Sequence, residues 1–173
     1  MATEKQSYAI IKKDINIELR EYTSTILASV TVDASSHGNA GNKGFSLLAD
    51  YIFGNNMDTT NIKMTAPVII KQAGNRSYEV SFVMPSKYTI ESIPVPMNIA
   101  VTLREVGPHP AAAIIFGGYS GEHNIKSNTG LLKKWLEKNK LVQKGDVLVA
   151  RYDPPWKPGF MRLNEIIINV AKD

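Results

Sequence analysis

The chain contains no cysteine, which excludes a disulfide framework and a zinc-thiolate site. It also lacks any apolar run approaching the ~18 residues that cross a bilayer as a helix. The opening residues, MATEKQSYAIIKKD, include no apolar segment long enough for a secretion signal. We therefore expect a cytoplasmic protein without a membrane span.

Histidine is scarce, and no arrangement typical of a catalytic or metal site can be drawn from it. The three histidines, His37, His109 and His123, lie far apart, and none has the i, i+4 spacing of a helical metal pair. No serine stands in a G-x-S-x-G elbow, and no nucleophile can be paired with a base. We therefore predict that the protein is not an enzyme. A metal ligand stays unassigned, with His37 as the candidate.

The excess of positive charge is small, because 20 basic and 16 acidic residues give a net charge of +4. The lysines cluster once, and that spacing is typical of the solvated face of a helix. The cluster consists of Lys133, Lys134, Lys138 and Lys140. A nucleic-acid interface would require basic residues interleaved with exposed aromatic residues, and the sequence shows no such stretch. We expect a monomer that binds no nucleic acid.

Two halves of the chain resemble each other. Leu19-Arg20-Glu21 recurs as Leu103-Arg104-Glu105, and Leu47-Leu48 recurs at the same separation as Leu131-Leu132. Alternating apolar residues predict strands, and apolar residues at helical spacing predict one helix in each half. The predicted strands cover residues 15–19, 26–32, 68–71 and 78–84, then 99–103, 111–118, 146–152 and 163–170.

The predicted fold class is α+β. Each half is expected to be strand, strand, helix, strand, strand, with the halves at about 8–86 and 99–171. Two such pseudo-symmetric β-β-α-β-β halves can close eight strands into a distorted barrel with two helices packed on it. We expect one domain over residues 8–173, preceded by a tail of residues 1–7.

Each predicted helix has an apolar face that must pack on the sheet. The face of the first helix is made of Phe45, Leu48, Ala49 and Ile52. The second helix begins near Ser127 and carries Leu131, Leu132, Trp135 and Leu136. A cleft between such a helix and the barrel is where a small ligand would bind.

The loop YDPPWKPGFMRLNE, residues 152–165, is unusually stiff and apolar. Its prolines restrict the backbone, so ordering this loop costs little entropy. Trp156 and Phe160 either fold back onto the core or wall a pocket, with Lys157 at the rim to meet an anionic ligand. Met64 is likewise either a core residue or part of a pocket wall. A flat apolar ligand with carboxylates at one edge would fit these residues.

Four motifs, taken in order, resemble the SOUL heme-binding protein family. They are KMTAPV at 63–68, FVMPS at 82–86, FGGY at 116–119, and the loop that begins YDPPWKP and ends RLNE. The resemblance extends over nearly the whole chain. It implies the fold predicted above and the noncovalent, reversible binding of heme b or another tetrapyrrole by an intracellular carrier or buffer. It implies no catalytic turnover, and we expect no other cofactor.

The resemblance also implies a binding site between the first helix and the stiff loop. Together with the residue patterns above, it gives the candidate site Asn42, Phe45, Leu48, Ala49, Ile52, Met64, Trp156, Lys157 and Phe160. The apolar members would wall the macrocycle, and Lys157 would meet a propionate.

Three positions differ from the family pattern. Asn42 and Asp50 stand where the mammalian heme-binding branch carries basic residues, and Glu21 stands where some members have a histidine proposed as the iron ligand. The resemblance therefore implies no axial ligand for the iron in this chain. Either the protein gives the iron no ligand, or His37 or a methionine serves.

These differences keep two alternatives open. The first is a general small-molecule effector-binding module, because the gyrase-inhibitor-like fold shares the two-half architecture. The second is a protein-interaction module that uses the second predicted helix, from Asn128 to Lys140.

Overall fold

The computed structural model describes residues 2–154 and 156–172. Its helices are α1 (His37–Ile52), α2 (Glu122–Lys138) and the short 3-10 helix η1 (Gly159–Met161). Its strands up to the middle of the chain are β1 (Glu4–Lys5), β2 (Tyr8–Asp14), β3 (Ile17–Tyr22), β4 (Thr25–Asp33), β5 (Thr65–Ala66), β6 (Val68–Gly74) and β7 (Ser77–Val83). The remaining strands are β8 (Thr102–Val106), β9 (His109–Gly117), β10 (Leu141–Gln143), β11 (Leu148–Arg151) and β12 (Leu163–Lys172).

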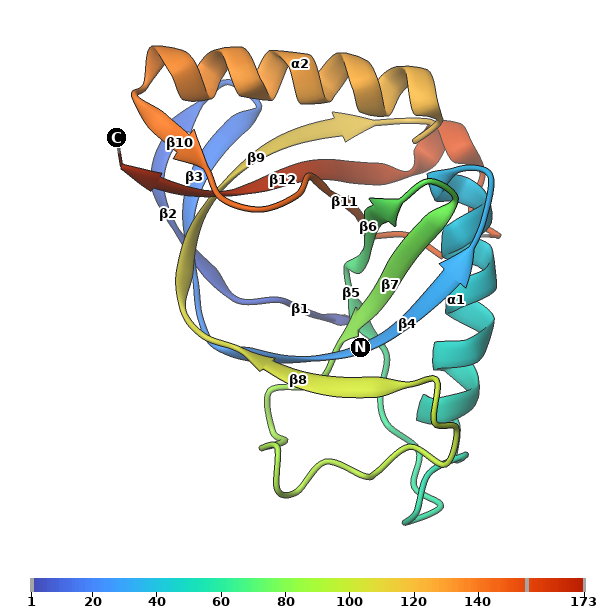
Figure 1. Ribbon diagram of the computed structural model, residues 1–173. Helices are drawn as coiled ribbons and strands as arrows, with labels where there is room; N and C mark the ends of the chain where they lie inside the picture. Colours follow the sequence, from blue (N-terminus) through green and yellow to red (C-terminus); the bar gives the residue numbers. More distant parts are fainter. Residues whose placement is uncertain (1, 155, 173) are drawn as a thin grey trace.

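One curled antiparallel sheet forms the body of the molecule, in the order β2-β3-β9-β12-β11-β6-β7-β4-β8, with β10 beside β12. Both helices lie on its outer face, α1 against β4, β6 and β7, and α2 against β9, β10 and β12 (Figure 1). Within the described residues, β2 and β8 each pair with one neighbour, so the sheet is an open half-barrel. The predicted α+β class, with two helices packed on a barrel-like sheet, is confirmed.

All eight predicted strands are present, although β8 begins at Thr102 instead of residue 99, and the ten-stranded sheet also contains β2 and β10, which were not predicted. Strand β2 forms a hairpin with β3 around Ile15, whose φ is 57°. Nearly all of β2 is exposed, so it lacks the apolar alternation by which a half-buried strand is predicted. Helix α2 begins at Glu122 after the N-cap Gly121, before the start near Ser127 that the apolar pattern predicted.

The two halves exchange strands within the sheet. Strand β3 pairs with β9, and β4 pairs with β8, so the first strand of each half joins the second strand of the other. The halves also meet through β6 and β11. The order from β3 inward is β3, β9, β12, β11, and the order from β8 inward is β8, β4, β7, β6. Strands at the same place in these two series occupy the same position in the two halves. This order agrees with a duplicated unit, and the division into two repeats stays a prediction.

The apolar faces of both helices are used by the core. Leu48 and Ile52 of α1 have 0 % and 1 % of their surface exposed, and Trp135 of α2 has 7 %. The indole nitrogen of Trp135 also donates a hydrogen bond to Asp14 Oδ2 at 3.1 Å. The interaction-module alternative thus loses most of the apolar face on which it rested, and Leu131 remains as an exposed apolar residue of α2.

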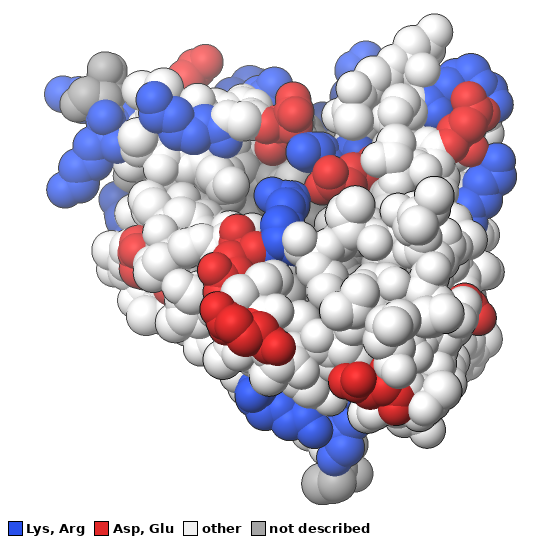
Figure 2. All heavy atoms as spheres, turned by 60° about the horizontal axis from the view of Figure 1, so that its bottom comes forward, with Lys and Arg blue, Asp and Glu red and all other residues white. Residues whose placement is uncertain are grey.

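No helix in the described part of the chain is both long enough and apolar enough to cross a membrane. Figure 2 shows the face that lies at the bottom of Figure 1, around β8 and the connection that precedes it. Acidic and basic side chains are interspersed there, and neither sign forms a continuous patch on this face.

Candidate functional site

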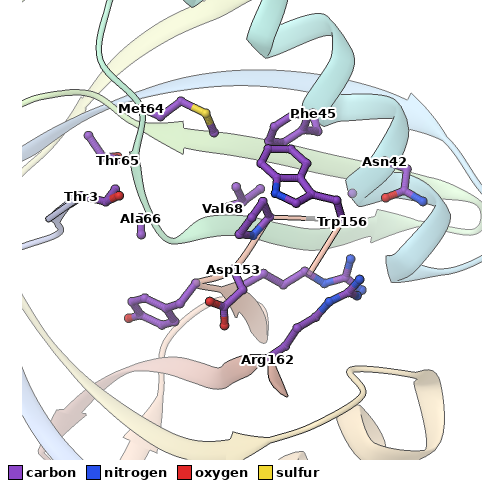
Figure 3. A pocket seen from close by; sticks show the side chains of 14 residues that line it. Thr3, Asn42, Phe45, Met64, Thr65, Ala66, Val68, Asp153, Trp156 and Arg162 are labelled. Atoms are coloured by element: carbon purple, nitrogen blue, oxygen red, sulfur yellow. The ribbon is translucent and has the colours of Figure 1, made fainter. Parts of the chain in front are cut away.

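A cavity of about 200 Å³ lies between α1, the β5–β6 segment and the loop that follows β11. Helix α1 contributes Gly41, Asn42 and Phe45 to its lining. Residues 64–66 and 68 line a second side, and the loop and its flanking strands close the rest (Figure 3). Segments from the first, the middle and the last third of the chain therefore build this cavity together.

The apolar wall of the cavity is aromatic. Phe45 and Trp156 meet edge to face with ring centroids 6.5 Å apart, and Figure 3 shows them side by side over the cavity. Phe45 also contacts Phe82 edge to face at 5.5 Å, which fixes its ring against β7. Trp156 is 75 % exposed, so its indole covers the cavity from the solvent side. Such a rim offers a large flat surface to an aromatic ligand.

Hydrogen bonds brace the loop that carries Trp156. Lys157 Nζ donates to Asp153 Oδ1 at 2.7 Å, and the backbone N–H of Leu163 donates to Asp153 Oδ2 at 2.6 Å. Arg162 Nε donates to the carbonyl of Lys157 at 2.7 Å. Burial by itself would raise the pKa of Asp153, but the bonds from Lys157 and Leu163 outweigh it and lower that pKa. Asp153 is therefore a fixed anion that already holds the Lys157 ammonium.

Arg151 brings a second guanidinium to the cavity. It ends β11, and strand alternation puts it on the helix-facing side of the sheet with Val149. Its Nε is buried and has no hydrogen-bond partner among the described residues. Burial and the neighbouring charge of Arg162 lower the pKa of Arg151, although the carboxylate of Glu122 acts in the opposite direction.

Tyr152 connects the cavity to a buried ionic network on the sheet face away from the helices. Its hydroxyl donates to Glu165 Oε1 at 2.5 Å, and Arg20 binds both oxygens of Glu165. Arg20 also donates to Glu18 Oε2 and to the Tyr22 hydroxyl, each at 2.8 Å. Burial would lower the pKa of Arg20, but its bonds to Glu165 and Tyr22 raise it. This guanidinium is fully buried and fully paired, in contrast to that of Arg151.

The structure brings together four of the residues predicted for the site. Asn42, Phe45, Met64 and Trp156 all line the cavity. Leu48, Ala49 and Ile52 lie further along α1, where they are buried (0 %, 9 % and 1 % exposed) and do not line it.

The two other predicted loop residues lie beside the cavity. Lys157 is engaged by Asp153, and Phe160 is 72 % exposed without lining the cavity. Arg151, Tyr152, Asp153 and Arg162 line it but were absent from the predicted set. The available signal was a charged residue on the helix-facing side of an otherwise apolar strand, at position 151.

His37, the candidate metal ligand, lies away from this cavity. Its Nδ1 is 2.9 Å from Glu122 Oε1, its ring meets Tyr78 edge to face, and 7 % of its surface is exposed. It lines a separate depression with residues of β6 and α2. The described residues contain no group of three or more His, Cys, Asp or Glu side chains that could hold a metal ion.

Solved structures share this fold at low sequence identity. The C-terminal domain of EcmrR is 13 % identical, with a TM-score of 0.68 over 91 % of this chain and 98 % of that one. A hydrolase from Listeria innocua is 8 % identical, with a TM-score of 0.63 over 93 % and 94 % of the two chains. SAV2435 bound to tetraphenylphosphonium is 11 % identical, with a TM-score of 0.52 over 91 % and 94 %. At such identities the likeness shows the fold alone.

Family membership rests on the sequence itself. No curated protein matches the chain. Residues 3–169 match the family model described as SOUL heme-binding protein. The match includes both halves, the two helices and every segment that lines the cavity. The chain therefore belongs to the SOUL heme-binding protein family.

Proposed function

We propose that the protein binds heme b or a related tetrapyrrole noncovalently and reversibly in the cavity between α1 and the loop after β11. It would serve as a cytoplasmic carrier or buffer. The observation that carries the proposal is the pairing of an aromatic wall with a cationic corner. Phe45 and Trp156 supply the wall, and Arg151 and Arg162 supply the corner. A tetrapyrrole needs both, because its macrocycle is flat and apolar and its propionates are anionic.

The residues of the cavity fit such a ligand in chemistry and, in part, in size. At about 200 Å³ the cavity is smaller than the roughly 300–1,000 Å³ of typical ligand pockets. The ligand would therefore extend outward under the exposed Trp156. Heme b brings its own iron, and the thioether of Met64 is an axial ligand type known from other heme proteins.

The expected affinity is moderate. Burying several hundred Å² of macrocycle at ~25 cal/mol per Å² contributes several kcal/mol, and part of this is offset by the cost of association. A dissociation constant of about 1 μM follows. Reversible binding of this strength suits a protein that carries a ligand and releases it.

A hemin titration of the purified protein tests the proposal. We expect a saturable shift of the Soret band with one hemin per chain, and a further change of that band in the Met64→Leu variant if the thioether ligates the iron. A linear response that does not saturate, equal to the nonspecific adsorption of hemin by an unrelated protein, would overturn the proposal.

A second candidate function is a general effector-binding module. It is favoured by the structure of SAV2435, which shares this fold and is described as bound to the lipophilic cation tetraphenylphosphonium. In this chain, two guanidinium groups line the cavity and would repel such a cation. Titration with tetraphenylphosphonium separates the two functions, because saturable binding of this cation at the cavity would favour the effector module.

Removal of the exposed indole should weaken tetrapyrrole binding. We expect the Trp156→Ala variant to bind hemin about tenfold more weakly, because a ring stacked on the macrocycle and its buried area are both lost. The exposed indole makes few contacts that support the fold, so the melting temperature should stay nearly unchanged. Phe53→Ala, which removes another exposed aromatic ring (62 % exposed) that does not line the cavity, is the matched control. Equal affinities of the Trp156→Ala variant and the wild type would remove Trp156 from the site.

A further inference from the structure

The charge of Arg151 has no counter-charge bound to it. Its side chain makes no hydrogen bond or salt bridge among the described residues, and its Nε is buried. Arg151 as a whole is half-buried, and a charged group with a buried donor that lacks a partner is costly, so native proteins retain such groups where they have a use. The fully buried Arg20 bonds to carboxylates within the protein, whereas the buried Nε of the half-buried Arg151 has no partner among the described residues.

The surroundings of Arg151 favour an anion. Arg162 lines the same cavity, and the first turn of α1 contains no acidic residue. The acidic groups nearby are already engaged, Asp153 by Lys157 and Glu122 by the backbone and ring of His37. The positive charge of Arg151 therefore remains available to a ligand.

Helix α1 is shaped to admit this guanidinium. A Cβ placed on Gly41 would lie 3.1 Å from Arg151 Nη1 and 2.9 Å from Ile70 Cδ1. A Cβ placed on Gly38 would lie 3.7 Å from Arg151 Nη2. The guanidinium thus lies against a glycine-lined stretch of the helix, beside Asn42 and Phe45 at the cavity wall.

An ordered water is the simplest other occupant of this corner. Asn164 faces Arg151 across the β11–β12 ladder, and its Oδ1 is also buried without a partner. A water between the two would satisfy one donor and one acceptor. A water would leave the positive charge of Arg151 unneutralised. An anionic ligand would supply both a hydrogen-bond acceptor and a counter-charge.

We propose that Arg151 anchors a carboxylate of the ligand, so that the cavity selects flat aromatic anions over their neutral and cationic analogues. This inference rests on the proposed function and names Arg151 as the group that recognises the ligand. The anchor lies on β11 and lines the cavity together with Asn42 of α1. Lys157, whose ammonium Asp153 already binds, contributes less.

The test compares protoporphyrin IX with its dimethyl ester, which has the same macrocycle and no carboxylate. We expect wild-type protein to bind the acid about 10- to 100-fold more tightly than the ester, as hydrogen bonds to charged groups provide. In Arg151→Met the acid should lose most of this advantage while the ester binds as before. Arg151→Lys, which keeps the charge but not the forked geometry, should retain part of it.

Two further variants make the comparison specific. Arg104→Met removes an arginine that pairs with Glu79 and does not line the cavity, and it should leave both affinities unchanged. Lys157→Met should keep the preference for the acid. Loss of that preference in Lys157→Met, with retention in Arg151→Met, would overturn the proposal, and so would equal binding of acid and ester by wild-type protein.

A non-porphyrin anion distinguishes failure of this inference from failure of the proposed function. Titration with 1-anilinonaphthalene-8-sulfonate should show saturable binding that Arg151→Met weakens about tenfold or more. If neither porphyrin binds but the sulfonate binds in this Arg151-dependent way, tetrapyrrole binding fails and anion selection stands. If wild-type protein binds the porphyrin acid and Arg151→Met binds both anions as wild type does, tetrapyrrole binding stands and the anchor is refuted.

Discussion

Replacing Arg20 with methionine is expected to destabilise the fold by roughly 3–5 kcal/mol, because two buried carboxylates lose their shared cation. Arg20 is 0 % exposed, and Glu18 and Glu165 are 4 % and 3 % exposed. The guanidinium also lies 4.1 Å from the centroid of the Tyr8 ring. Thermal unfolding should report a fall in melting temperature of about 10 °C or more for a chain of this length.

Two controls identify the cause of that loss. Arg104→Met breaks the half-exposed Arg104–Glu79 pair, and such pairs contribute less than about 1 kcal/mol. The triple change Arg20→Met, Glu18→Gln and Glu165→Gln removes the uncompensated carboxylates and should recover part of the stability. If Arg20→Met melted within a degree or two of wild type, the network would contribute little to stability.

Replacing Gly44 with alanine is expected to destabilise the fold by about 3 kcal/mol, contrary to the usual effect of this change inside a helix. A Cβ on Gly44 would lie 2.4 Å from Val80 Cβ and within 2.7 Å of both its methyl groups. Val80 is fully buried on β7, so neither the side chain nor the strand can give way. The helix would have to move outward, which would also displace Asn42 and Phe45 at the cavity.

Gly130 of α2 provides the matched control for Gly44. No atom lies within 4 Å of the Cβ that alanine would add there. Gly130→Ala should therefore raise stability by up to about 1 kcal/mol through helix propensity alone. Chemical unfolding of both variants measures the difference. Equal changes in the two variants would show that α1 can shift away from β7 at little cost, and the tight contact at Gly44 would not govern its position.

Residues of the candidate site could be predicted where a local sequence pattern singles them out. The composition of the stiff loop singled out Trp156, and the helical spacing singled out Phe45. Leu48 and Ile52 share that helical face, but they lie where α1 meets the sheet, and they are buried in the core. Periodicity gives the direction in which a side chain points, and it does not say where along the helix the packing ends and a cavity begins.

Arg151 shows the limit of the same reasoning. Alternation along 146–152 puts it on the side of Val149, which a reader of the sequence can establish. This side of β11 lies under the glycines of α1 because β11 pairs with β6 and α1 packs over β6. Neither contact can be established from the local sequence. Its lack of a partner depends on Asp153 and Glu122 being engaged elsewhere.

The sequence by itself determined eight of the strands, both α-helices, the α+β class and the order of motifs that marks the SOUL family, because these are encoded in residues close together in the chain. The tertiary structure decided the exchange of β3 and β8 between the halves, the meeting of α1 with the loop after β11, and the unpaired guanidinium beside the aromatic wall. These features depend on contacts between segments far apart in the chain, and such contacts are settled by packing and register over the whole sheet.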